Sequence, residues 1–205
     1  EETEVIDDVP HATETEIDFL LSTINTALAR PLTRADIRGT YAGLRPLVDH
    51  GSGSTADVSR RHLVITDSSG MVTVTGGKLT TYRAMAQDAV DAALVAGRFL
   101  PRECRTQRLP LVGATAFGAS QAPGFIVEAH GSEADLVVAE ANGDASLLEP
   151  IAAGLDMTPA QFLFGVRHEG ALTVDDLVDR RTRLGMCADD REKAVEVAQW
   201  ALDQA

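Results

Sequence analysis

Residues 75–83 of this 205-residue chain read TGGKLTTYR, and they combine residue types that can hold a negatively charged or polar ligand. The glycine pair has no Cβ, so another group can approach its backbone closely. A helical pattern begins a few residues later, and a helix start presents unpaired N–H groups and a partial positive charge. Lys78 adds a full positive charge. The stretch predicts a site for an anion or polar ring, with a tight strand-to-helix turn as the alternative.

Two arginine positions extend this candidate site. Arg45 lies in AGLRPL and Arg60 in SRRH, on segments that we expect to converge with the Gly-Gly-Lys turn. Arginine binds phosphate or carboxylate through two parallel hydrogen bonds, although surface ion pairing is the alternative for each residue taken alone. The turn lacks both the spacing of a Walker A loop and that of a Rossmann G-x-G-x-x-G loop, so it predicts neither nucleotide-binding motif.

Other residue types that could do chemistry give weaker patterns. The five histidines are scattered without metal-ligand spacing, so we expect no metal site. Cys104 and Cys187 are too far apart in sequence for a disulfide framework or a zinc pattern, which fits a reducing cytosol. The basic stretch 176–186, DLVDRRTRLGM, favours salt bridges to surrounding acids over a binding patch.

The charge distribution points to a small ligand rather than to nucleic acid. The net charge is −13, which argues against nucleic-acid binding. Residues 41–83 nevertheless hold five Lys or Arg against three Asp or Glu, whereas residues 84–205 hold ten against nineteen. A basic island in an acidic chain suits a small anion. No apolar run approaches about 18 residues, so we expect a cytoplasmic protein, with peripheral attachment to the cytoplasmic face of a membrane left open.

The elements that must position the turn follow from periodicity. The T-x-x-E sequence at Thr13 begins a helix over 13–29, and a short helical turn follows at 33–37. Residues 40–48 look extended and 49–57 form a loop. Two β-rich runs at 62–66 and 71–75 surround a Gly-ended turn and predict a hairpin. A helix over 80–96, capped by Gly97, then carries an apolar side made of Tyr82, Met85, Ala86, Ala89, Val90, Ala93 and Leu94.

The second half of the chain changes character. Residues 98–124 are rich in Pro, Gly and Arg, and we place a domain boundary there, dividing 1–104 from 105–205. Beyond this boundary the pattern predicts helices at 123–130, 132–141, 145–149, 158–169, 173–183 and 189–204. The fold class is therefore α+β, with strands and a helix followed by an all-α C-terminal domain.

Three segments together resemble one family: TYAGLRPLV, then SRRHLVITDSSGMVTVTGGKLTTYRAMAQDAVD, then LVDRRTRLGM. They resemble the C-terminal part of an FAD-dependent glycerol-3-phosphate dehydrogenase of the respiratory kind. The resemblance covers nearly the whole chain. It implies that residues 1–104 form the late strands and helix of a FAD- and substrate-binding domain, and that 105–205 form the helical C-terminal domain.

The resemblance also implies roles for single residues. The segment that matches the family's flavin contact consists of Gly76, Gly77, Lys78, Leu79 and Thr80. Arg45, Arg60 and Lys78 match positions around the phosphorylated substrate. The implied reaction is hydride transfer from sn-glycerol 3-phosphate to FAD, giving dihydroxyacetone phosphate, with electrons passed to quinone. Two alternatives stay open, namely an oxidase that uses oxygen, and a helical module that binds a partner or a second copy of the chain.

Parts of the family pattern are missing from this sequence. The dinucleotide fingerprint that holds the FAD pyrophosphate and the upstream residues that would act as general base are both absent. The chain opens with Glu1 in EETEVIDD, which favours a fragment of a longer protein. We therefore expect this fragment alone to bind FAD weakly and to be inactive.

Overall fold

The computed structural model describes residues 7–44, 61–114 and 120–204. Within them the chain forms two compact units, and each is described by itself. The first unit takes in 7–10, 43–44 and 61–109 of the described residues, and the second takes in 11–42, 110–114 and 120–204.

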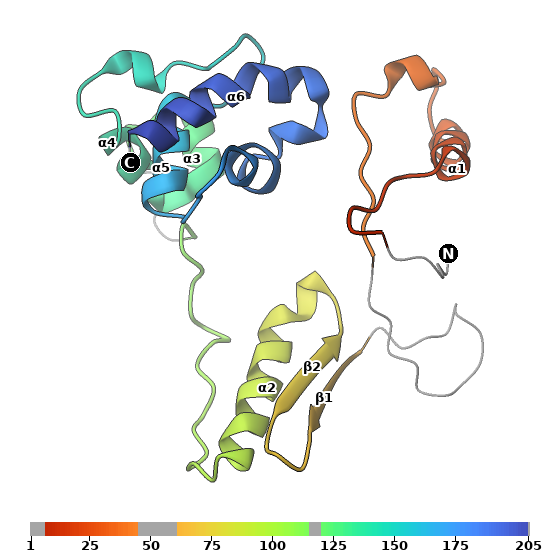
Figure 1. Cartoon of the computed structure of the whole chain (residues 1–205), viewed down its shortest axis with the longest axis vertical. Helices are drawn as coiled ribbons and strands as arrows, with labels where there is room; N and C mark the ends of the chain where they lie inside the picture. The colour runs from red at the N-terminus through yellow and green to blue at the C-terminus, as the bar shows by residue number, and fades with distance from the viewer. Residues whose placement is uncertain (1–6, 45–60, 115–119, 205) are drawn as a thin grey trace. The chain divides into compact units, whose positions relative to one another are not determined.

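The first unit contains the predicted hairpin. Strand β1 (His62–Thr66) pairs antiparallel with β2 (Val72–Gly76), with His62 opposite Gly76 (Figure 1). Asp67 closes the turn because its Oδ1 accepts hydrogen bonds from the N–H groups of Ser69 at 2.8 Å and Met71 at 3.1 Å. The turn ends at Gly70, whose φ of 88° favours glycine. The β-rich runs thus pair as the sequence predicts.

Helix α2 (Tyr82–Ala96) follows a 3₁₀ turn, η3 (Leu79–Thr81), and packs on both strands. The predicted apolar side of this helix is only partly correct. Met85 is half-buried against the hairpin, but Tyr82 and Val90 are 49% and 58% exposed. A two-stranded sheet is narrow and covers one stripe of a helix, so the rest of the apolar side is left at the surface.

The second unit begins with α1 (Glu14–Asn25), which starts at the predicted capping box. The Thr13 N–H donates to Glu16 Oε2 at 2.8 Å, and the Glu16 N–H donates to Thr13 Oγ1 at 3.3 Å. The helix is shorter than the predicted 13–29. Asn25 ends it by bonding the backbone of Leu32 in both directions, at 2.9 and 2.7 Å, which turns the chain back. A 3₁₀ turn, η1 (Arg34–Asp36), follows.

The rest of the second unit is helical. Its α-helices are α3 (Gly124–His130), α4 (Ala134–Ala139), α5 (Pro159–Arg167) and α6 (Ala188–Asp203). Shorter turns separate them: η4 (Gly131–Glu133), η5 (Ala145–Leu148), the π-helical η6 (Asp176–Arg181) and η7 (Leu184–Met186). These elements confirm the fold class, α+β with a helical C-terminal part.

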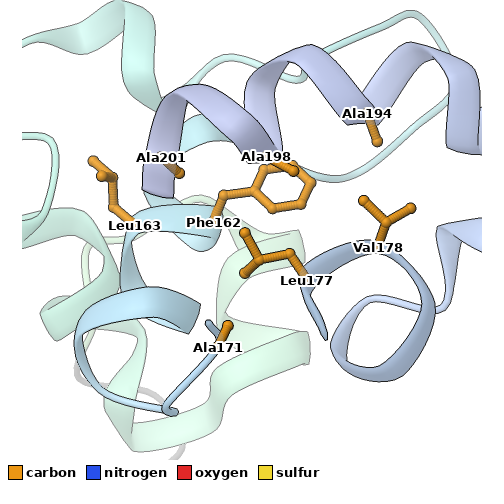
Figure 2. Close-up of a cluster of buried hydrophobic side chains, with 8 residues drawn as sticks. All are labelled: Phe162, Leu163, Ala171, Leu177, Val178, Ala194, Ala198 and Ala201. Carbon is orange, nitrogen blue, oxygen red and sulfur yellow. The ribbon is translucent and has the colours of Figure 1, made fainter. Parts of the chain in front are cut away.

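Helix α5 lies at the centre of this unit and is buried on nearly every side. On one side Phe162 and Leu163 pack against three alanines of α6 and against Leu177 and Val178 of η6 (Figure 2). The alanines, Ala194, Ala198 and Ala201, recur at helical spacing and let the two helices approach closely. On the other side Phe164 packs against Ile126 and Val137. Among the helices that the structure describes, none is long and apolar enough to cross a membrane.

Candidate functional site

The TGGKLTTYR stretch forms the junction between β2 and α2 in the first unit. Gly76 and Gly77 have φ values of 74° and 81°, a region that residues with a Cβ rarely adopt. Lys78 then returns to an extended backbone with φ −142° and leads into η3. Two successive left-handed residues reverse the chain at the end of the strand, which explains why the sequence has glycine at both positions.

Hydrogen bonds within the junction leave two donors unused. The Lys78 N–H donates to Thr81 Oγ1 at 3.1 Å, and the Thr81 N–H donates to the Lys78 carbonyl oxygen at 2.9 Å. The N–H groups of Leu79 and Thr80 have no hydrogen-bond acceptor within the part of the chain that the structure describes. Such groups are the unsatisfied donors of a helix start, and they are available to a ligand.

Gly77 is also required by the neighbours beneath it. A Cβ at this position would stand 2.5 Å from Met85 Sδ and 3.2 Å from His62 Cβ. The strand-to-helix turn is therefore tight for internal reasons. The structure therefore shows the alternative that the sequence left open, a tight strand-to-helix turn, and ligand binding at the same junction stays a prediction.

An open hollow of about 590 Å³ lies over the junction. Its lining residues are Leu44, Gly76, Gly77, Lys78, Leu79, Thr80, Tyr82 and Met85. Leu79 is 88% exposed there. All five residues of the predicted flavin contact thus line one concave surface, together with apolar side chains and unused amide donors. This combination fits the edge of a flavin ring, which is flat, apolar over its faces and rich in hydrogen-bond acceptors at its pyrimidine end.

Sequence reasoning placed three further residues differently or left them out. Leu44 belongs to the GLRPL motif, but the prediction singled out its neighbour Arg45. Tyr82 and Met85 were expected only on the packing side of the helix, whereas both line the hollow. Their place directly after the GGKLTT motif was the available signal. Arg45 and Arg60 lie outside the described residues, so their roles stay predictions.

The basic stretch 176–186 is a network of ion pairs, as the sequence suggests. Arg180 pairs with Asp176 at 2.6 Å and Arg181 with Glu169 at 3.5 Å. Asp179 accepts from Arg191 Nε at 3.1 Å, and a Cβ on Gly185 would stand 1.7 Å from Asp179 Oδ1. The glycine of the LGM sequence therefore makes room for the carboxylate that binds Arg191.

Two histidines of the helical part of the second unit, which we call the helical unit (residues 120–204), make structural contacts. His130 is half-buried at the edge of Phe164, and burial lowers its pKa, which favours the neutral ring. Gln161 Nε2 can only donate, so His130 Nε2 accepts this 3.1 Å hydrogen bond. His168 Nε2 lies 2.8 Å from Glu140 Oε1. Among the described residues, no group of His, Cys, Asp or Glu is arranged to hold a metal ion.

Comparisons with known proteins connect the two units to one family. Residues 104–204 match a domain family described as the C-terminal domain of alpha-glycerophosphate oxidase. The chain is 47% identical over 210 residues to glycerol-3-phosphate dehydrogenase 1 of Mycobacterium tuberculosis, an alignment that covers 97% of this chain and 40% of the relative.

More distant relatives have similar names. Glycerol-3-phosphate dehydrogenase 2 of Mycobacterium bovis is 38% identical over 86% of this chain and 33% of its own length. A mitochondrial glycerol-3-phosphate dehydrogenase of Arabidopsis thaliana is 34% identical over 90% of this chain and 34% of its own length. The chain thus spans about 40% or less of the length of each of these relatives, and it includes both the hollow and the helical unit.

Proposed function

Because this chain belongs to the family of glycerol-3-phosphate dehydrogenases, we propose that it contributes the C-terminal part of a flavoprotein that oxidises sn-glycerol 3-phosphate to dihydroxyacetone phosphate. The observation that carries the proposal is the hollow over residues 76–80, where Lys78, two unused amide donors and apolar side chains meet. The division of labour follows the predicted domains, with 1–104 holding ligands and 105–205 forming the helical domain.

The junction would hold one edge of the cofactor. FAD, when bound, supplies the acceptor for the hydride that leaves C2 of the substrate. The amides of Leu79 and Thr80 would donate to the pyrimidine end of the ring, and Gly76 and Gly77 would let the ring lie close to the backbone. The start of α2 adds a partial positive charge that favours negative charge at that edge.

The cations of this region would hold the substrate. Lys78 lines the hollow, and Arg45 and Arg60 are proposed to join it around the phosphate group. Three positive groups would more than balance the two negative charges of a phosphate monoester, and fixing the phosphate would orient C2 toward the ring. These residues bind and orient, while the group that removes the hydroxyl proton comes from elsewhere in the enzyme.

The electron acceptor is proposed to be a quinone, reached by a cytoplasmic protein resting on the membrane surface. Oxygen is the alternative, since the family of residues 104–204 takes its description from an oxidase. Reduction of a quinone analogue and production of hydrogen peroxide distinguish these two acceptors. Both would be measured on one preparation of the chimera described next, because the chain alone is expected to be inactive.

Lys78 gives the direct test of the substrate site. We would build a chimera in which this chain replaces the aligned region of the Mycobacterium tuberculosis relative, keeping the remaining 60% or so of that protein. Lys78→Met in this chimera should raise KM for glycerol 3-phosphate and lower kcat, together reducing kcat/KM by about a hundredfold, because a charge-assisted contact to phosphate is lost.

The chain offers a matched control, since its only other lysine is Lys193. Lys193 lies on α6 of the helical unit, beside Asp190 at 3.5 Å. Lys193→Met removes the same charge and should leave both constants unchanged. Equal kinetics for the Lys78 and Lys193 variants would remove Lys78 from the site. A folded chimera that binds no flavin would refute the proposed function itself.

A binding role for the helical unit is the second candidate. A shallow apolar hollow of about 300 Å³ is lined by Leu147, Pro159, Glu196, Val197 and Trp200. Such a surface suits a partner subunit or a second copy of the chain. Sedimentation at several concentrations tests self-association, and a monomer at every concentration would leave the helical unit as a packing domain of the enzyme.

A further inference from the structure

We propose that His62 and Asp88 are positioning residues, which together hold the Gly76–Thr80 junction in the geometry that flavin and substrate require. This inference rests on the proposed function. Neither residue lines the hollow, so neither is placed against the ligands. Both act from behind the junction, through the backbone of the glycine pair.

His62 meets the junction at both glycines. It stands opposite Gly76 in the register of the hairpin. Its Cβ would be 3.2 Å from a Cβ built on Gly77, so the two backbones are in close contact. Because His62 is part of a paired strand, this contact cannot shift as a flexible side chain could. The place of His62 therefore determines the place of both glycines.

The imidazole of His62 joins the strand to the helix. Its Nε2 lies 2.6 Å from Oδ2 of Asp88, which belongs to the second turn of α2. Met85, three residues before Asp88 on the same helix face, packs beneath Gly77. Gly77 is thus enclosed between His62 on the strand side and Met85 on the helix side. The hydrogen bond fixes the separation of these two sides.

This pair is better suited to positioning than to stabilising the fold. The side chains of His62 and Asp88 are 20% and 52% exposed, and exposed pairs contribute little to the free energy of unfolding. Position matters more at this junction. Hydrogen bonds weaken steeply as distance and angle depart from their preferred values, so a small displacement of the junction amides would weaken their contacts to a ligand. Loss of the pair should therefore weaken ligand binding more than it weakens the fold.

Amide hydrogen exchange on this chain tests the geometric step without any ligand. In His62→Leu the amides of Lys78 and Thr81, which close the junction, should exchange about tenfold faster, because one charge-assisted hydrogen bond restrains them. His62→Gln keeps a side-chain N–H donor toward Asp88 and should restore most of the protection. Asp91→Asn, also at the surface of α2, is the matched control and should leave both amides unchanged.

The functional step is tested in the chimera with variants of both members of the pair. His62→Leu and Asp88→Leu should each raise the dissociation constant for FAD, followed by flavin fluorescence, by about tenfold. They should also raise KM for glycerol 3-phosphate more than they lower kcat. The double variant should be no worse than either single one, because the pair acts as a unit.

Each outcome decides the inference. The inference is supported if His62→Leu shows both faster exchange at the junction and weaker flavin binding, while His62→Gln stays near wild type. Faster exchange with unchanged flavin affinity would reduce the pair to a structural role and overturn it, as would unchanged exchange. If the wild-type chimera folds but binds no flavin, the proposed function fails and this inference fails with it. The exchange experiment distinguishes that result from a failure of the His62–Asp88 pair.

Discussion

Gly77 shows how packing constrains a single position within the junction that we propose binds the ligands. Its φ of 81° excludes most other residues, and Met85 and His62 fill the space that a side chain would need. The sequence predicts the need for glycine, because a pair of glycines between strand and helix indicates an unusual backbone. It could not predict the neighbours, since His62 lies on the other strand and Met85 is eight residues further along.

A comparison of Gly77→Ala with Gly70→Ala separates the cost of backbone strain from the cost of side-chain crowding. Both glycines have left-handed φ, at 81° and 88°, but nothing lies within 4 Å of a Cβ on Gly70. Gly70→Ala should destabilise the hairpin by about 1 kcal/mol through strain alone. Gly77→Ala should cost about 2 to 3 kcal/mol, because crowding adds to the strain. Exchange of the β2 amides measures both, and equal costs would contradict the crowding.

Glu140 gives the helical unit a pH dependence with a definite sign. Burial raises the pKa of this carboxyl, but hydrogen bonds from Arg167 and His168 outweigh it, and the pKa lies below the ordinary 4.5. A lowered pKa stabilises the fold fully above pH about 4.5 and loses this contribution as the pH falls through the folded value. Thermal unfolding followed by Trp200 fluorescence should therefore show a midpoint that falls below pH about 4.5.

Glu140→Gln is the matching variant. The Glu140 side chain is 11% exposed and pairs with Arg167. Removing its charge should therefore destabilise the helical unit by about 1 to 2 kcal/mol at pH 7. The variant should also flatten the acid limb of the pH profile. A variant that loses stability but keeps the full acid limb would assign the pH dependence to other carboxyl groups.

At the scale of elements, apolar periodicity predicts the positions of helices well. It predicts less well the type of each helix and the elements that pack against it. The helices over 123–130 and 158–169 appear as Gly124–His130 and Pro159–Arg167. The pattern over 173–183 also predicts a helix, but most of it is π-helical, from Asp176 to Arg181. Local hydrogen bonds accompany the wider turn: Thr182 Oγ1 donates to the carbonyl oxygens of Leu177 and Val178, at 2.8 and 3.2 Å. Sequence periodicity does not carry that information.

Helices α1 and α5 each begin with a capping box, at Thr13 and Thr158, and these two boxes allow an exposed helix start to be compared with a buried one. Thr158 is fully buried and its Oγ1 accepts from the Gln161 N–H at 3.3 Å. Thr158→Ala should lower the stability of the helical unit by about 2 kcal/mol, because it removes a buried hydroxyl that accepts from the Gln161 N–H and donates to Gln161 Oε1. Thr13→Ala at the exposed box of α1 should cost about 0.5 kcal/mol. Chemical denaturation followed by Trp200 fluorescence measures the first, and similar losses would contradict the role of burial.

For the whole molecule, burial is concentrated in one unit. Within the described residues, every fully buried hydrophobic side chain lies between Ile126 and Ala201. The hairpin and α2 have no buried residue, and their exposed apolar side chains include Tyr82, Val90 and Leu79. The pattern of α2 predicts a helix with a wide apolar face, and a two-stranded sheet cannot cover it. About 60% of the length of the Mycobacterium tuberculosis relative lies outside the aligned region, and we propose that the corresponding part of the enzyme covers this face of α2.

The two units should therefore unfold in two steps, the hairpin and α2 before the helical unit. Because hydrophobic burial is the main favourable contribution to folding, the amides of β1, β2 and α2 should exchange orders of magnitude faster than those of α5 and α6. The purified chain should also be colourless, because it provides only one wall of the proposed flavin site. In the chimera both properties should change together, with a yellow protein and slower exchange in the hairpin. A yellow one-to-one complex of FAD with the chain alone would show that residues 76–80 and their neighbours suffice for binding. Hairpin amides that exchange as slowly as those of α5 would show that the hairpin needs no further packing partner.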